Sequence, residues 1–194
     1  MKRGVKKLTK EVTDSEIESK LVVVDDEPFF FFNKLVKALR VGLNGFIVSP
    51  RFPHIVESGS FNSYYQTEGN KETEGIKFLA RPDVAKAVFK SQTELVNDIY
   101  GLGCILKRRE LRGSYFPLDE GSISEILERE NRQGGQAFIF VGELERLRKA
   151  FWIDNQETGR AYHISIDRCR TEGGVFYELE IEYIDKILDK IKSD

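Results

Sequence analysis

Hydrophobic and polar residues alternate along much of this sequence with a period of two, as is typical of half-buried β-strands. The segment Glu16-Ile17-Glu18-Ser19-Lys20-Leu21 shows this alternation and runs into the β-branched residues Val22–Val24. Similar patterns predict strands over residues 54–67, 75–81, 104–112, 136–152, 161–168 and 175–183, and a less regular element over 86–95. The pattern therefore predicts about eight strands.

Helical signals interrupt the strands at two places. Asp25-Asp26-Glu27-Pro28 places acidic residues and a proline where a helix begins, and we expect this helix to end near Arg40, before Gly42. A second helix is predicted from Asp119 to about residue 132, ended by Gly134-Gly135. Residues 185–192 also have helical spacing, and residues 1–14 resemble a polar leader.

Strands that follow one another without βαβ alternation favour an antiparallel sheet. A sheet of about eight strands must curl, close or split into two layers. A chain of 194 residues is long enough for one domain with a full core and short for two. We therefore expect residues 15–194 to form a single α+β domain, a closed antiparallel β-barrel with two or three peripheral helices.

The amino-acid composition bears on the binding partners and the cellular location of the protein. With 40% hydrophobic and 32% charged residues and a net charge of −2, nothing indicates a surface that wraps a polyanion. Cys104 and Cys169 lie far apart and have no CxxC partner, which favours reduced thiols. The basic residues 1–7 precede no apolar signal segment, and the apolar run Pro28–Phe32 is far too short to span a membrane. These features predict a cytoplasmic protein without a membrane partner.

Charged residues share faces on several predicted strands, because side chains at i and i+2 point to the same side. Glu16, Glu18 and Lys20 share one face, and Glu178, Glu180 and Glu182 share another. The middle strands are basic, at Lys77, Arg81, Arg108, Arg146 and Arg148. For residues 107–112 the pattern leaves open which face points inward.

These charged strand faces have two possible interpretations. Half-buried strands ordinarily hold their charged face in water. Alternatively, a closed barrel brings its first and last strands together, so that Glu16, Glu18, Glu178 and Glu180 surround a divalent cation. The basic residues would then bind phosphate oxygens, and metal and cations together would polarise a phosphoanhydride.

The segment Glu16-Ile17-Glu18-Ser19-Lys20 resembles the ExExK signature of the CYTH superfamily, the triphosphate tunnel metalloenzymes. Later segments follow in the family's order over residues 15–184. Tyr64–Thr67 resembles a "YYDT" segment, Phe78–Arg81 an "LRIR" strand, and Val88–Lys90 an "LTLK" strand. The remaining matches are Arg108–Glu110 to "KRRE", Glu145–Phe151 to "KxRxxY", Tyr162–Arg168 to "ISLDR", and Phe176–Glu182 to "FVEIEIE".

This resemblance implies a metal-dependent triphosphate hydrolase that uses Mg²⁺ or Mn²⁺. The implied metal ligands are Glu16, Glu18, Glu178 and Glu180, and the implied catalytic residues are Glu18, Lys20 and Asp167. Substrate phosphates are expected at Lys20, Lys77, Arg81, Lys90, Arg108, Arg146 and Arg148. The expected ligand is a triphosphate-bearing small molecule or an RNA 5′ end, and a homodimer is left open.

Two alternatives remain at the level of the sequence. A class IV-type adenylyl cyclase would use the same metal and phosphate groups, with a ribose hydroxyl in place of water. A non-catalytic module that binds triphosphates is motivated by Gln66 and Leu79, which replace an aspartate and an arginine of the family pattern. His54 and His163 are expected to be structural rather than ligands, and Trp152 is expected to pack in the core or the outer coat.

Overall fold

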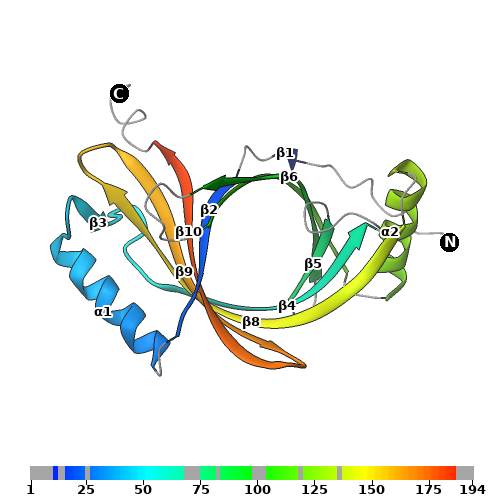
Figure 1. Ribbon diagram of the computed structural model, residues 1–194, viewed down its shortest axis with the longest axis horizontal. Coiled ribbons are helices and arrows are strands. Elements are labelled where there is room, and N and C mark those ends of the chain that lie inside the picture. Colours follow the sequence, from blue (N-terminus) through cyan, green and yellow to red (C-terminus); the bar gives the residue numbers. More distant parts are fainter. Residues whose placement is uncertain are drawn as a thin grey trace. The chain divides into compact units, whose positions relative to one another are not determined.

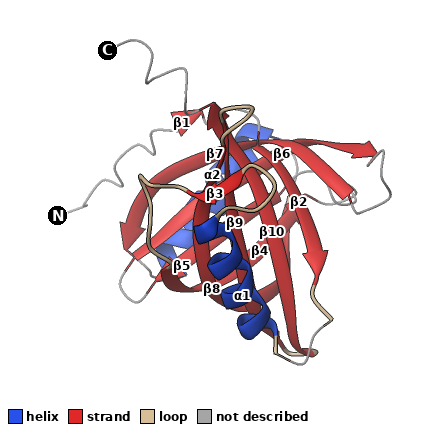
Figure 2. Ribbon diagram, turned by 90° about the vertical axis from the view of Figure 1, so that its left-hand side faces the viewer, coloured by secondary structure: helices blue, strands red, loops and turns tan. Residues whose placement is uncertain are grey.

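The computed structural model describes residues 11–12, 16–24, 27–67, 75–81, 84–97, 104–117, 120–134 and 137–186. Ten strands and two helices lie within these ranges (Figures 1 and 2). The helices are α1 (Pro28–Val41) and α2 (Glu120–Gly134). The strands are β1 (Glu11–Val12), β2 (Glu16–Val22), β3 (Phe46–Val48), β4 (Val56–Thr67), β5 (Gly75–Arg81), β6 (Val84–Asn97), β7 (Cys104–Pro117), β8 (Phe138–Asn155), β9 (Arg160–Thr171) and β10 (Gly174–Lys186).

Both predicted helices are present, within about two residues of the expected ends. Pro28 occupies the first turn of α1, where its missing N–H is not needed. Gly42 follows the helix with φ of 92°, and its N–H donates to the Leu39 carbonyl. Neither α1 nor α2 has the length and apolar character needed to cross a membrane.

Three elements differ from the sequence prediction. Strands β1 and β3 were not expected, because two or three residues are too few to show a period of two. Asp185 and Lys186 continue β10 instead of starting a helix, since they pair with Ala161 and Arg160 of β9. The rest of the expected C-terminal helix, residues 187–194, lies outside the described residues.

The chain divides into two compact units, and each is described by itself. The α1 unit comprises Glu16–Gly59, Glu94–Lys107 and Glu145–Asp194, and the α2 unit comprises Met1–Ser15, Ser60–Thr93 and Arg108–Leu144. Every strand pair with a described register is antiparallel. The fold is therefore α+β and antiparallel as expected, while closure of the strands into a barrel stays a prediction.

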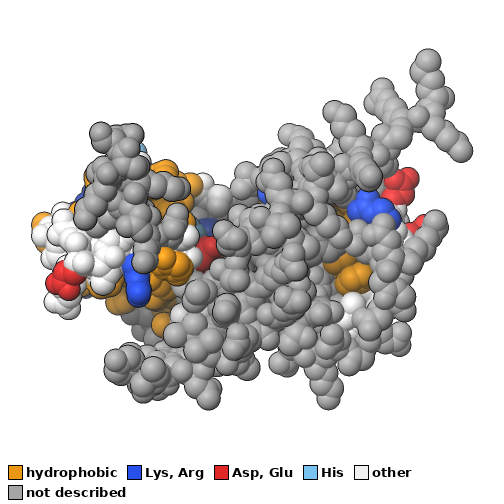
Figure 3. Space-filling view, turned by 90° about the horizontal axis from the view of Figure 1, so that it is seen from above, with side chains coloured by type: hydrophobic (Ala, Val, Ile, Leu, Met, Phe, Trp, Pro, Cys, Tyr) orange, Lys and Arg blue, Asp and Glu red, His pale blue; other side chains and the backbone are white. Residues whose placement is uncertain are grey.

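In the α1 unit, strands β2, β10, β9 and the second part of β8 pair in that order, and β3 also pairs with β8. Helix α1 covers one face of these strands (Figure 2). Phe32 of α1 meets Phe151 of β8 edge to face, with ring centroids 5.1 Å apart, and Ile164 and Ile166 of β9 complete this core. Some hydrophobic side chains of this unit, among them Phe30 and Phe31, remain exposed at its surface (Figure 3).

In the α2 unit, strands β4, β5 and β6 pair in sequence order. Ile76 and Phe78 of β5 and Ala87 of β6 pack with Ile126 of α2 into a second core. Because strand side chains alternate, Lys77 lies on the other face of β5. Each unit thus buries one sheet face beneath its own helix.

Candidate functional site

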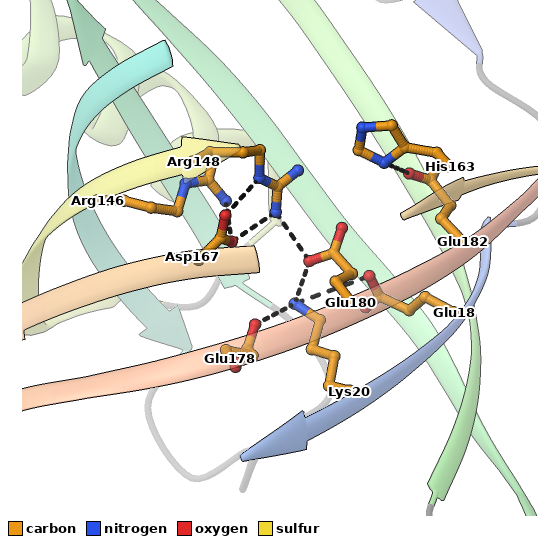
Figure 4. A network of polar contacts seen from close by, with 9 residues as sticks. All are labelled: Glu18, Lys20, Arg146, Arg148, His163, Asp167, Glu178, Glu180 and Glu182. Carbon is orange, nitrogen blue, oxygen red and sulfur yellow. Dashed lines mark hydrogen bonds and ion pairs between the residues drawn. The ribbon is translucent and has the colours of Figure 1, made fainter. Parts of the chain in front are cut away.

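Several charged side chains from strands β2, β8, β9 and β10 gather on the sheet face that α1 leaves uncovered. Register places Lys20 of β2 opposite Glu180 of β10, and Glu178 of β10 opposite Asp167 of β9. Asp167 in turn lies opposite Arg148 of β8. We call seven interacting residues the charged cluster (Figure 4): Glu18, Lys20, Arg146, Arg148, Asp167, Glu178 and Glu180.

Lys20 lies among three carboxylates. Its Nζ is 3.2 Å from Glu180, 3.4 Å from Glu178 and 3.7 Å from Glu18. Burial lowers the pKa of Lys20, but the carboxylates of Glu180 and Glu178 more than offset this, so the pKa lies above its usual value. The ammonium is therefore charged at neutral pH.

Arg148 links the two most buried carboxylates of β9 and β10. Its Nε and Nη2 donate to the two oxygens of Asp167 at 2.7 Å each, and Nη2 also donates to Glu180 at 3.0 Å. Only 1% of Asp167 and 6% of the Glu180 side chain are exposed. Burial raises the pKa of Glu180, but Lys20 and Arg148 together hold it well below its usual range. Glu180 is therefore ionised although it is buried.

His163 lies on the same face of β9 as Asp167. Its Nδ1 is 3.6 Å from Glu182, and its ring lies 5.0 Å from the ring of Trp152. Burial and the nearby Arg148 lower the pKa of His163 to about 4, so the imidazole is neutral at neutral pH. Trp152 thus lies on the polar face against His163, which differs from its expected place in the core or outer coat.

Two groups of side chains have the spacing of metal ligands among the described residues. In the first, ligand atoms of Asp167, Glu178 and Glu180 all lie within 4.8 Å of one another. In the second, the same holds for His163, Glu180 and Glu182. Sequence reasoning did not select His163 or Glu182 as ligands, although Glu182 lies two residues from Glu180 and His163 four residues from Asp167, which places each on the face of a selected residue.

Some of the predicted site residues lie in the charged cluster, and others do not. Glu178 and Glu180 belong to the first group together with Asp167, whereas Glu18 approaches the cluster through Lys20 and belongs to neither group. Arg146 joins through Asp167, with 3.6 Å between Nη1 and the carboxylate. Lys77 belongs to the α2 unit. The side chains of Glu16, Arg81, Lys90 and Arg108 lie outside the described part of the structure.

The cluster can bind both signs of charge. Its four carboxylates and three cations leave a formal charge of −1. Carboxylate oxygens are the ligands that hard divalent cations prefer, and arginine forks match phosphate oxygens. The residues therefore suit a divalent cation beside a phosphate-bearing ligand.

No protein-family model and no curated protein sequence matches this chain. Among solved structures, it is similar to a candidate adenylate cyclase from Bacillus halodurans, with 17% identity over 94% of this chain and 86% of that chain and a TM-score of 0.48. A conserved hypothetical protein from Pyrococcus furiosus has 12% identity over 92% and 84%, with a TM-score of 0.45. The RNA triphosphatase Pct1 of S. pombe has 10% identity over 94% and 75%, with a TM-score of 0.34.

The TM-scores of these three structures all lie below 0.5, so the likeness assigns no function to this chain.

Proposed function

We propose that this protein is a metal-dependent triphosphate hydrolase whose reaction takes place at the charged cluster. The observation that carries this proposal is the network in which Arg148 and Lys20 share the buried carboxylate of Glu180. Moving charged side chains out of water into such a buried site costs free energy. A site that keeps carboxylates and cations on one face is suited to bind a cation and an anion at once.

Asp167, Glu178 and Glu180 would hold the divalent cation, because their oxygens already lie within ligand spacing of one another. An all-oxygen donor set suits Mg²⁺ or Mn²⁺. When bound, such an ion polarises the phosphate oxygens and offsets the charge that develops on them. Glu178 is the most accessible of the three, with 26% of its side chain exposed.

Lys20, Arg146 and Arg148 would bind the phosphates. Without a ligand, the carboxylates neutralise these cations at distances of 2.7 to 3.7 Å. A cation bound to the carboxylates would weaken their ion pairs with the lysine and the arginines. These side chains could then turn their donors to phosphate oxygens. Metal and triphosphate would therefore strengthen each other's binding, by the same factor in both directions.

Lys20 would have the central role, since three carboxylates position its ammonium. An ammonium that is already at the site when the ligand binds can stabilise the charge that develops on a phosphate oxygen. Asp167, fixed by two hydrogen bonds from Arg148, can accept a proton from an attacking water only after that arginine moves. Lys77 remains a predicted phosphate ligand that this argument does not use.

Product analysis tests the proposal. The protein is incubated with inorganic triphosphate, nucleoside triphosphates, thiamine triphosphate and a 5′-triphosphorylated RNA, with Mg²⁺ or Mn²⁺. We expect release of phosphate from at least one of them. Formation of a cyclic nucleotide would instead identify a cyclase, and binding without turnover a non-catalytic module.

Two matched variants locate the activity. Glu178 pairs with Lys20 at 3.4 Å, and Glu145 pairs with Arg170 at the same distance on the exposed surface. Glu178→Gln should reduce phosphate release by at least ~10-fold and weaken metal binding, since even outer ligands of metal sites contribute that much. Glu145→Gln should leave both unchanged. Equal activities of the two variants would exclude the charged cluster as the active site.

A further inference from the structure

A second ligand group lies beside the charged cluster and has a different chemistry. His163 of β9 and Glu182 of β10 are opposite each other in register, and Glu180 lies two residues from Glu182 on the same face. Ligand atoms of these three side chains all lie within 4.8 Å of one another. Unlike the group of Asp167, Glu178 and Glu180, this one offers a nitrogen.

The contact between His163 and Glu182 has the spacing of a pair that shares an ion. Nδ1 of His163 and Oε2 of Glu182 are 3.6 Å apart, which is too long for a hydrogen bond. Two ligands bound tetrahedrally at 2.0 to 2.2 Å from a zinc ion are separated by about 3.3 to 3.6 Å. Nδ1 is also buried and has no hydrogen-bond partner among the described residues.

Ser165 provides an independent sign that a ligand belongs here. Its side chain is fully buried, and its hydroxyl has no hydrogen-bond partner within the described part of the chain. Ser165 lies opposite Glu180 in register and between His163 and Asp167 on β9. A buried hydroxyl without a partner is destabilising, and a water bound to an ion at this position would provide a hydrogen-bond partner for it.

The aromatic side chain of Trp152, itself packed against Phe52, lies beside the imidazole of His163 and restricts its movement. The ring of Trp152 lies 5.0 Å from that of His163, and the ring of Phe52 lies 5.1 Å from that of Trp152. Only 12% of the His163 side chain is exposed. A ligand that is held in place before binding loses little conformational freedom when the ion enters.

We propose that His163, Glu180 and Glu182 form a transition-metal site, of the kind that takes Zn²⁺, separate from the Mg²⁺ or Mn²⁺ position. Imidazole nitrogen favours Zn²⁺ and its neighbours in the first row over Mg²⁺, which prefers oxygen ligands throughout. Three protein ligands leave a fourth tetrahedral position for a water, next to Ser165. The two sites share Glu180, so an ion in one changes the ligand available to the other.

The chain contains two histidines, which makes the test direct. Protein without a histidine tag is labelled with ¹⁵N-histidine and titrated with Zn²⁺ in the presence of excess Mg²⁺. We expect the imidazole nitrogen signals of His163 to shift with one equivalent of Zn²⁺ and those of exposed His54 to stay. Magnesium alone should move neither set to the Zn²⁺-bound position. Signals of His163 that do not respond to Zn²⁺ would overturn the proposal.

A matched pair of variants identifies the carboxylate ligand. Glu182→Gln should weaken Zn²⁺ binding at least ~10-fold in the same titration, whereas Glu145→Gln on the exposed surface of β8 should not. Equal Zn²⁺ affinities in both variants would also overturn the site. The readout uses no triphosphate, so the metal site stands or fails independently of the hydrolase activity proposed above.

Discussion

Arg148 offers a quantitative test of how the charged cluster is held together. Its guanidinium donates three hydrogen bonds, two to Asp167 at 2.7 Å and one to Glu180 at 3.0 Å. Replacing it by methionine keeps most of the side-chain volume and removes every donor. Removing one partner of a buried ion pair typically costs about 3–5 kcal/mol, because the remaining charge is buried without compensation.

The expected loss lies at the lower end of this range. Lys20 remains 3.2 Å from Glu180, and Arg146 remains 3.6 Å from Asp167, so both carboxylates keep one cation nearby. We expect Arg148→Met to lower the free energy of unfolding by about 3 kcal/mol, measured by urea denaturation at neutral pH. In a chain of this size the midpoint of thermal unfolding should fall by roughly 6–12 °C.

The destabilisation by Arg148→Met should also depend on pH. In the unaltered protein the folded-state pKa of Glu180 lies below its ordinary value of 4.5, so this group's stabilisation is present above that value and is lost as the pH falls through the lowered pKa. Without Arg148 the folded-state pKa rises, and the variant gains relative stability as protons neutralise the carboxylates. The difference between the two proteins should therefore stay nearly constant around neutral pH and shrink as the pH falls below 4.5.

Arg170→Met is the control, since Arg170 pairs with Glu145 at 3.4 Å while 59% and 44% of the two side chains are exposed. An exposed pair of this kind contributes about 0–1 kcal/mol. If Arg148→Met were no more destabilising than Arg170→Met, or if its effect did not decrease in acid, the network would not be held by buried charge pairs as argued.

Three further predictions follow from the cores and the site. Phe32→Ala should lower the free energy of unfolding by about 3–5 kcal/mol in urea denaturation, because Phe32 is fully buried against Phe151, whereas Phe30→Ala, at a position 53% exposed, should cost far less. Burial raises the pKa of Cys169 to about 12, so peptide mapping after iodoacetamide treatment at pH 8 should show it unmodified in the folded protein and alkylated in urea; labelling at equal rates in both states would contradict its burial. Excess EDTA should abolish phosphate release and Mg²⁺ or Mn²⁺ should restore it, while hydrolysis that continues in the chelator would exclude a metal at the carboxylates.

Much of the fold could be predicted because it depends on local patterns. Alternation along Glu16–Lys20 and Tyr177–Glu182 assigns each side chain to a face whatever strand lies beside it. Pro28 and Gly42 mark the ends of α1 through their own backbone preferences, and Gly134 marks the end of α2. Strands β1 and β3 could not be found in this way, since they exist by pairing with β7 and β8.

Alternation alone assigns Glu18, Lys20, Glu178 and Glu180 to polar strand faces, because the side to which a residue points depends only on its place in its own strand. Which of these charges meet depends on how the strands pair. The register of β10 between β2 and β9 places Lys20 against Glu180, Asp167 against Glu178, and His163 against Glu182. A shift of one residue would turn the set to the other face, and a shift of two would exchange the partners. The register depends on how several whole strands pack together beneath α1. It therefore cannot be inferred from any single segment of the sequence.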